Sequence, residues 1–359
     1  MGTASSPEKT AHDCERCART FGSAEALLQH EKDSPAHAHA PGAAALTPSH
    51  KPKGTNCETC CRDAEALRQH ETDSPAHNQP ITHRGNTYTR LSVPEQSSLY
   101  LKLFQSRHSR ARLSLENYAF TPTASLTATP KPHPRHPMRK ALVLDCEMAG
   151  GAGLPDQVVA ISVIDFLTGE TLLNALVEPS GPITQWRSQI TGITRARMAA
   201  AVADGSALGG RAEAVARLFE LLDQDTVLVG HSMQNDLRVL GLLHGRIVDT
   251  GILTAKASGR FGEDERVRRT VGLERLCREL AGVEIRGGGG GGCHNSLEDV
   301  LATREVVIWC LRHPEELKAW AVRNWPVDCG VNWGKGGNRR ARGGNRFEME
   351  RLSKYYGDP

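Results

Sequence analysis

The chain has 359 residues, with 44 Lys and Arg against 41 Asp and Glu and a formal net charge of +3. This near balance gives little support to a function based on overall positive charge alone. The chain contains neither an apolar run of about 18 residues nor an N-terminal secretion signal, so we expect no membrane association and no secretion.

A zinc finger is predicted within residues 1–40. Four residues have the types and spacing of a tetrahedral zinc site: Cys14, Cys17, His30 and His37. The six residues between the two histidines exceed the usual spacing of about three to five. His39 is therefore an alternative fourth ligand. Cys-x-x-Cys pairs with downstream histidines favour Zn²⁺ in a reducing compartment over disulfides.

Residues 55–80 repeat part of this pattern at an offset of 40 residues. The corresponding ligands are Cys57, Cys60, His70 and His77. Gln79 stands where His39 would be copied, which favours His37 as the fourth ligand of the first copy. Cys61 stands where the first copy has Phe21, a residue of its small apolar core, so the second copy is interpreted as either a zinc finger or a degenerate one. Both units resemble the two-Cys, two-His fingers of RNA-associated proteins; the alternative is incidental Cys and His in a disordered arm.

Two linkers are expected around the second finger. Residues 41–54 are rich in Ala, Pro, Gly and Lys, which is typical of a flexible spacer. Residues 81–139 are predicted to be a further linker with one helix, from Pro94 through Arg110, which could either dock on the following domain or contact RNA. The five prolines between Thr121 and Lys140 exclude a regular helix or a central strand there.

A large α/β domain is predicted over residues 140–315. Three consecutive strands are expected at Ala141–Met148, Gln157–Phe166 and Thr171–Glu178. Helices and strands then alternate: a helix at Arg211–Leu222, a strand at Thr226–Gly230, a helix at Gln234–Leu243, a strand at Arg246–Asp249 and two more helices. This order predicts a mixed sheet flanked by helices.

Asp145 and Glu147 stand at the end of the first strand of this domain. Residues two apart on a strand point to the same face, so the two carboxylates are predicted to lie side by side, while Cys146 points into the core. Two neighbouring carboxylates repel each other, and a divalent cation with oxygen ligands would relieve this repulsion. The pair therefore predicts a metal site.

Three later residues are candidates for the same site. Asp236 lies early in a helix, where an acid also has a purely structural explanation as a helix-start residue. His294 precedes a helix that carries Asp299 in its first turn, and this acid could instead belong to a capping box. The glycine run Gly287–Gly292 before His294 is either a simple insertion or the hinge of a mobile flap that carries a catalytic base.

Five short motifs in this order resemble the DEDD exonuclease superfamily in its histidine-containing subclass, DEDDh, which has a ribonuclease H-like fold. They are Asp-Cys-Glu-Met at 145–148, ITGIT at 190–194, GHSMQNDL at 230–237, IVDT at 247–250 and HNSLEDVLAT at 294–303. They look like the RNA exonuclease branch, which includes the yeast-type ribosomal-RNA-processing exonucleases and the interferon-stimulated exonuclease. The fingers and the glycine run depart from the minimal pattern of that branch.

The resemblance implies a catalytic set and its cofactors. Asp145, Glu147, Asp236 and Asp299 would hold two Mg²⁺ or Mn²⁺ ions, and His294 would deprotonate the attacking water. The implied reaction removes nucleotides from the 3′ end of single-stranded RNA, including pre-rRNA, and releases 5′-mononucleotides. The implied location is the nucleus or nucleolus. Two other functions stay open: a non-catalytic zinc-finger RNA-binding adaptor, and a DNA exonuclease with the same chemistry.

Other residues are candidates for RNA contact. Trp186 and Arg187 precede the ITGIT motif and could stack on bases and pair with phosphate, although a core Trp with an exposed Arg is equally compatible. Residues 316–359 are predicted to be a basic tail with three candidate contacts, Arg339, Arg340 and Arg342; a solvated disordered tail is the alternative. The sequence does not indicate an oligomeric state.

Four further residues in or near these motifs have simpler explanations. Asp249 is expected to cap the segment that follows its strand, and His231 to lie in a hydrogen-bonded turn. Asp156 and Asp165 are expected to be turn or solvent-facing acids.

Overall fold

A computed structural model of the chain describes residues 12–13, 20–21, 80–133, 138–151, 155–262, 264–267, 270–288 and 292–325. The chain divides into two units, Met1–Leu67 and Arg68–Pro359. In the first unit, strand β1 (His12–Asp13) pairs antiparallel with β2 (Thr20–Phe21). All eight predicted zinc ligands lie outside the described residues.

The second unit is built on a mixed sheet with the strand order β12-β10-β6-β7-β8. Its strands are β6 (Ala141–Gly151), β7 (Gln157–Asp165), β8 (Thr171–Leu176), β10 (Val227–Gly230) and β12 (Ile247–Asp249). Strand β10 is parallel to both β6 and β12, whereas β7 is antiparallel to β6 and β8. A short strand, β9 (Ile183–Gln185), pairs with the end of β6.

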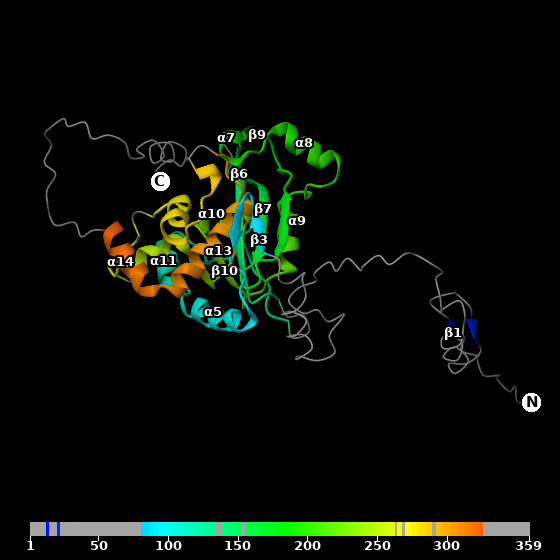
Figure 1. Ribbon diagram of the computed structural model, residues 1–359. Coiled ribbons are helices and arrows are strands. Elements are labelled where there is room, and N and C mark those ends of the chain that lie inside the picture. Colours follow the sequence, from blue (N-terminus) through cyan, green and yellow to red (C-terminus); the bar gives the residue numbers. More distant parts are fainter. Residues whose placement is uncertain are drawn as a thin grey trace, which may run out of the picture. The chain divides into compact units, whose positions relative to one another are not determined.

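Helices cover this sheet, so the predicted α/β architecture with a mixed sheet flanked by helices is confirmed. The helices after β9 are α7 (Ser188–Thr191), α8 (Arg195–Ala203), α9 (Arg211–Phe219), α10 (Gln234–Leu240), α11 (Thr250–Lys256), α12 (Leu273–Leu276), α13 (Ser296–Arg312) and α14 (Pro314–Asn324). Helix α12 continues as a π-helical turn, Cys277–Ala281. In Figure 1, α13 and α11 lie on one side of the strands and α9 on the other.

The side chains of β6 alternate between two hydrophobic cores. Ala141 and Val143 belong to the core that contains α13, whereas Leu142, Leu144 and Cys146 belong to the core that contains α9 and α10. This alternation is the period-two pattern of a strand that is buried on both faces. It also means that the odd-numbered residues of β6, continuing to 145 and 147, share the face covered by α13.

The stretch expected to be a linker with one helix, residues 81–139, is largely packed in the structure. It contains strands β3 (Ile81–His83) and β4 (Asn86–Tyr88), helices α5 (Val93–Gln105) and α6 (Arg110–Leu115), and strand β5 (Thr127–Ala128), which pairs with β11 (Leu242–Leu243). Leu99 and Leu103, one helical turn apart on α5, are buried in the core with α13. The burial of these side chains makes the segment part of the domain.

The helix predicted from Pro94 through Arg110 is two helices. Helix α5 ends at Gln105, and α6 starts anew at Arg110, where the Ser109 side chain accepts a hydrogen bond from the Arg112 backbone. A serine cap of this kind begins a new helix, so it separates the two elements. Arg112 is fully buried and donates to Glu116 and to the backbone carbonyls of Gly262 and Glu265.

Two other boundaries differ from the sequence expectation. Helix α10 ends at Leu240 and not at Leu243, because Gly241 adopts φ +68° and the chain turns into β11. The expected start of the basic tail at 316 falls inside α14, which buries Leu317, Trp320 and Ala321. These apolar residues, spaced at three and four, dock the helix on the core. Arg339, Arg340 and Arg342 lie outside the described residues.

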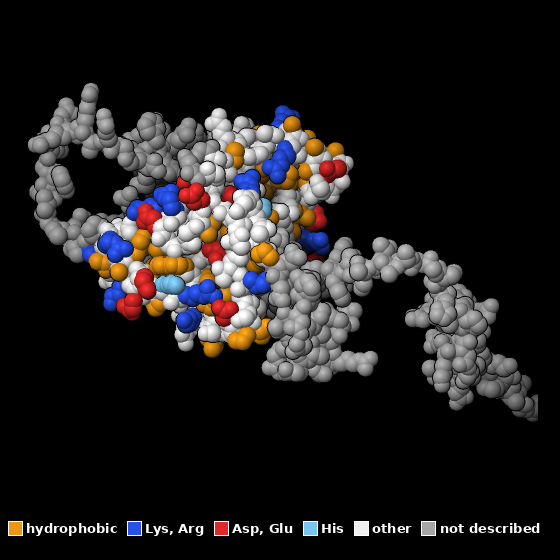
Figure 2. Space-filling view, viewed as in Figure 1, with side chains coloured by type: hydrophobic (Ala, Val, Ile, Leu, Met, Phe, Trp, Pro, Cys, Tyr) orange, Lys and Arg blue, Asp and Glu red, His pale blue; other side chains and the backbone are white. Residues whose placement is uncertain are grey.

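Positive and negative side chains are interspersed on the face of the molecule shown in Figure 2. Among the described residues, no helix has the length and apolar character needed to cross a membrane.

Candidate active site

Asp145 and Glu147 lie near the end of β6, on the face covered by α13. Their neighbours on this face, Ala141 and Val143, are fully buried, and Glu147 is itself only 6% exposed. The sheet and α13 thus enclose carboxylates that in an apolar core would be strongly disfavoured. Cys146, 7% exposed, points into the opposite core, as predicted from the strand period.

Asp236 reaches the same place from α10. It is 4% exposed, and its Oδ1 accepts a hydrogen bond of 2.9 Å from the backbone N–H of Cys146. Asp236 is therefore tied to β6 at the residue between Asp145 and Glu147. A helix-start role alone does not explain this contact, because the partner lies on the central strand.

Asp299 and His294 complete the group from the start of α13. Asn295 caps this helix by accepting a hydrogen bond of 3.0 Å from the backbone N–H of Glu298, so Asp299 lies in the first turn, 3% exposed. His294 precedes the cap, and its backbone N–H donates to the carbonyl of Ile190 at 2.5 Å. One potential ligand atom from each of Glu147, His294 and Asp299 lies within 4.8 Å of the others.

The carboxylates raise one another's pKa. Burial and the charges of Asp236, Asp299 and Glu147 raise the pKa of Asp145 well above its usual value. Burial also raises the pKa of Glu147, with a further contribution from the Asp299 charge. The structure thus brings together the four acids that the sequence pattern selected, at a cost that a bound cation would offset.

Burial followed by the nearby Arg286 charge lowers the pKa of His294 to about 4. The imidazole is therefore neutral near pH 7 and able to accept a proton.

Two buried oxygen atoms in this group suit a divalent cation. Among the described residues, Glu147 Oε1 and Asp299 Oδ1 are buried and have no hydrogen-bond partner. Buried carboxylate oxygens normally have partners, and hard divalent cations prefer oxygen ligands of this kind. The donor set therefore fits a divalent metal site.

Arg286 is a component that the motif analysis did not select. Its Nη2 lies 3.1 Å from Asp299 Oδ2 and 3.2 Å from His294 Nδ1. Burial lowers the pKa of Arg286, but the charge and hydrogen bond of Asp299, together with the charges of Glu274 and Asp145, raise that pKa above its usual value. A sequence signal existed: Arg286 is a lone cation between an apolar stretch and the glycine run that leads to His294.

Asp249, His231 and Asp165 have the structural roles expected of them, whereas Asp156 forms an ion pair with Arg187. Asp249 caps α11 by accepting from the backbone N–H groups of Gly251 and Ile252, and it also accepts from the Tyr118 hydroxyl at 2.6 Å. His231 follows β10, and its Nδ1 lies 2.7 Å from Oγ1 of Thr250, the first residue of α11. Asp165 is a turn residue that accepts from the backbone of Leu167, but it is buried and does not face solvent.

Trp186 and Arg187 both make contacts within the protein. Trp186 is partly buried and packs against a small core that includes Ile193 and Met198. Arg187 adopts φ +49° and pairs through both Nη atoms with Asp156, at 2.9 and 2.8 Å. A bidentate pair of this geometry orients the guanidinium, so Arg187 is neither a simple exposed cation nor unpaired.

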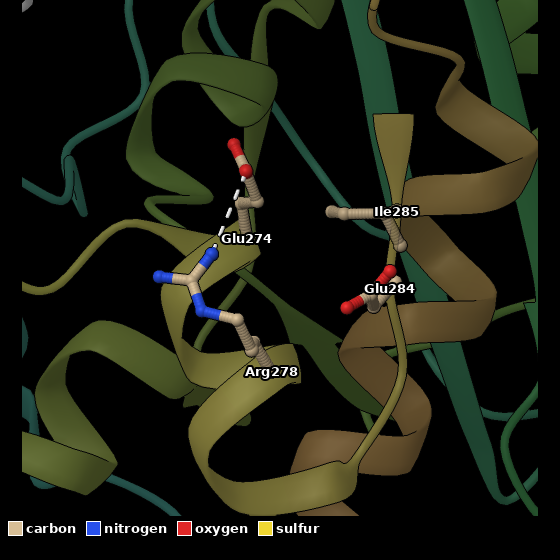
Figure 3. Close-up of a pocket in the computed structure, with 4 residues that line it drawn as sticks. All are labelled: Glu274, Arg278, Glu284 and Ile285. Carbon is tan, nitrogen blue, oxygen red and sulfur yellow. Dashed lines mark ion pairs between the residues drawn. The ribbon is translucent and has the colours of Figure 1, made fainter. Parts of the chain in front are cut away.

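A small hollow lies elsewhere in the domain, lined by Glu274, Arg278, Glu284 and Ile285. In Figure 3, Arg278 points toward Glu274, with which it forms an ion pair of 3.8 Å. None of the five predicted catalytic residues lines this hollow. The cluster of four acids and His294, which lies between β6, α10 and α13, is the candidate active site.

Comparison with known proteins shows that this region is similar to one protein family. Residues 142–307 match the Exonuclease (RNase_T) family, and that range contains all five residues of the group. The mixed sheet flanked by helices agrees with the ribonuclease H-like fold of such nucleases. This region, a little under half of the chain, is therefore similar to exonuclease domains.

The chain is similar to RNA exonucleases over this region. It is 29% identical over 170 residues to RNA exonuclease 3 of Saccharomyces cerevisiae, covering 47% of this chain and 37% of that protein. It is 28% identical over 169 residues to small RNA degrading nuclease 3 of Arabidopsis thaliana, covering 47% and 20%. The chain thus spans well under half the length of these relatives.

Among solved structures, the pseudoubiquitin hydrolase-RNA exonuclease module of Saccharomyces cerevisiae Pan2 is similar at a TM-score of 0.43, with 16% identity, covering 57% of this chain and 34% of that chain.

Proposed function

We propose that this domain is a metal-dependent 3′–5′ exoribonuclease that releases 5′-mononucleotides. The observation that carries the proposal is the convergence of four acids and His294, where buried oxygen atoms of Glu147 and Asp299 lack hydrogen-bond partners. Relatives described as RNA exonucleases support RNA as the substrate.

Each residue of the group has a defined role in the proposed reaction. Asp145, Glu147, Asp236 and Asp299 would hold two Mg²⁺ or Mn²⁺ ions, which when bound stabilise charge on the attacking and leaving oxygens of a phosphodiester. His294, neutral near pH 7, accepts the proton of the attacking water. The apolar faces of β6 and α13 limit solvent around the carboxylates and strengthen their electrostatic interactions.

The sequence pattern supports binding roles for segments outside the candidate active site. We infer that residues 1–40 and 55–80 bind Zn²⁺ and contact RNA, and that Arg339, Arg340 and Arg342 add basic contacts. We further infer action on pre-rRNA in the nucleus or nucleolus. Zinc content of the purified protein, measured by mass spectrometry in wild type and in Cys14→Ser and Cys57→Ser variants, tests the two fingers separately.

One assay tests the proposed reaction. Purified protein with Mg²⁺ or Mn²⁺ is incubated with matched single-stranded RNA and DNA, each labelled at the 5′ or the 3′ end. We expect progressive shortening of 5′-labelled RNA and early release of labelled mononucleotide from 3′-labelled RNA. Equal cleavage of DNA would instead indicate a general exonuclease, because only 2′-hydroxyl contacts distinguish the two polymers. Binding without cleavage would indicate an adaptor.

His294→Ala separates catalysis from binding. We expect this variant to lose about 10²- to 10⁴-fold in kcat, because general base catalysis contributes about that much. Affinity for Mn²⁺ and for RNA should change little. Glu220→Gln, at the C-cap of α9, is the matched control: this 64%-exposed carboxylate lies outside the group, so the variant should retain full activity. Full activity of His294→Ala would contradict the assignment of the base.

A further inference from the structure

The hairpin formed by β3 and β4 lies outside the segment that matches the exonuclease family. Its two strands pair in register from Ile81 with Tyr88 to His83 with Asn86. The two turn residues, Arg84 and Gly85, both have positive φ, +48° and +83°. Two residues of this conformation form the tight turn that matches strand twist, so the tip of the hairpin has a defined geometry.

The base of this hairpin is fixed on α13. Tyr88 is 2% exposed, and the following residue, Thr89, donates to the Glu305 carboxylate through its backbone N–H and its hydroxyl. Arg304 donates to the carbonyl of Thr89 at 2.7 Å. Ile81 packs so close to Gly169 that a Cβ there would clash with it. These contacts hold the hairpin rigidly against the helix that carries Asp299.

The tip of the hairpin reaches both ends of the glycine segment. Before the segment, Asn86 Nδ2 donates to the backbone carbonyl of Glu284 at 2.8 Å. After it, His83 Nε2 lies 3.3 Å from Oδ1 of Asn295, the residue that follows His294 and caps α13. Figure 3 shows Glu284 and Ile285 on the stretch that leads into Arg286.

Glu298 joins these contacts. It is 2% exposed, and its Oε2 accepts from Arg84 Nη1 at 3.4 Å and from the backbone N–H of Arg286 at 3.2 Å. One carboxylate thus links the hairpin tip to Arg286, the residue that precedes the glycine segment. A buried carboxylate with charged and backbone donors holds them in a fixed arrangement.

His294 follows the glycine segment, and its described contacts lie at the two ends of that segment. Glycine has the largest conformational freedom of any residue, and six follow Arg286 in sequence. The two ends of the segment nonetheless lie side by side, because a Cβ on Gly292 would clash with the backbone of Arg286. The position of His294 must therefore be set by contacts at the two ends and by its own hydrogen bond to Ile190.

We propose that the β3–β4 hairpin is a positioning element for His294, in which Asn86, Arg84 and His83 hold the two ends of the glycine segment. This proposal rests on the proposed function, since it assigns the hairpin to the base of that reaction. The hairpin residues do not touch the reacting atoms, so they act through His294 and the loop that carries it.

The test compares three variants with wild type. They are Arg84→Ala, Asn86→Ala, and a triple variant that combines these two substitutions with His83→Ala. Misplacement of a base by about 1 Å can cost about 100-fold, so we expect kcat to fall about 10- to 100-fold while KM for RNA changes less than about twofold. Arg84→Lys should recover part of kcat, because it retains the cation beside Glu298. Thr87→Ala, on the exposed side of the same hairpin, is the matched control.

Hydrogen exchange on the protein without substrate supplies a readout independent of activity. We expect faster exchange over residues 284–296 in the alanine variants and unchanged exchange in the strands of the central sheet. Unchanged kcat together with unchanged exchange would overturn the proposal. A rise in KM with unchanged kcat would also overturn it, because the hairpin would then be an RNA-binding element. If wild type is inactive, the proposed function fails, and the exchange data alone decide whether the hairpin holds the segment.

Discussion

Three successive residues of β6 alternate between the candidate active site and the hydrophobic core, because neighbouring side chains on a strand point to opposite faces. Asp145 and Glu147 face α13 and the other acids, whereas Cys146 enters the opposite core. The backbone N–H of Cys146 nevertheless serves the site, because it donates to Asp236. At this scale one strand supplies two candidate ligands and also fixes a third through its backbone.

Arg286 gives a residue-scale prediction, because its guanidinium pairs with Oδ2 of Asp299, the same carboxylate whose buried Oδ1 suits a cation. Arg286→Gln removes one positive charge beside the carboxylates, so we expect about tenfold tighter Mn²⁺ binding in calorimetry. The metal-free variant should also unfold at a lower temperature, because Asp299 loses its ion-pair partner. Arg217→Gln, an exposed arginine on α9, is the control and should change neither quantity. Weaker Mn²⁺ binding in Arg286→Gln would show that Arg286 supports the metal site and does not compete with it.

At the scale of elements, α5 decides how far the domain extends. Its buried side chains lie in the same core as α13, so this helix stabilises the element that carries Asp299. The segment before residue 140 is therefore structural, although the family match begins at residue 142.

Leu103→Ala tests this role of α5. Leu103 is fully buried, and truncation of a buried leucine costs about 2–5 kcal/mol of unfolding free energy, which urea denaturation would measure. Leu101→Ala on the same helix is the matched control: Leu101 is 62% exposed, so a change within about 0.5 kcal/mol is expected. Equal small effects of both substitutions would mean that α5 does not contribute to the stability of the domain.

At the scale of the whole molecule, the buried acids couple stability to pH and to metal. Burial raises the pKa of Glu147 from 4.5 to about 9 and that of Asp236 from 3.8 to about 8. Their stabilising contribution is complete below the unfolded values and is lost as pH rises through about 8 to 9. Because the pKa of His294 is lowered in the folded protein, His294 makes stability rise with pH, but only below its ordinary pKa of 6.5.

We therefore expect the Tm of the metal-free protein to fall between pH 6.5 and 9, the window above the ordinary pKa of His294 and up to the raised pKa of Glu147. Mn²⁺ binds the deprotonated carboxylates, so the rise in Tm on adding it should be larger at the upper end of this window. Differential scanning fluorimetry with EDTA or Mn²⁺ measures both effects. In Glu147→Gln the decline with pH should be shallower; an equally steep decline would assign it to other groups.

Local sequence patterns were sufficient to predict the central sheet and the orientation of the side chains on β6. The strand period of β6 oriented Asp145, Cys146 and Glu147, and alternating apolar segments predicted the mixed sheet, because both depend on short-range periodicity. The order of motifs selected Asp236, His294 and Asp299, which the fold brings to one place. Interpreting residues 81–139 as a linker failed because the apolar residues of α5 find their partner on α13, about 200 residues later in sequence, and no local pattern contains that information.

The sequence by itself determined the kind of chemistry: the number of acids, their types and the histidine that accompanies them. Only the tertiary structure decided the surroundings of His294. Arg286 lies against Asp299, and the β3–β4 hairpin contacts both ends of the glycine segment through residues about 200 positions away. Ion pairs and hydrogen bonds of this kind depend on how distant elements pack, so spacing along the chain does not reveal them.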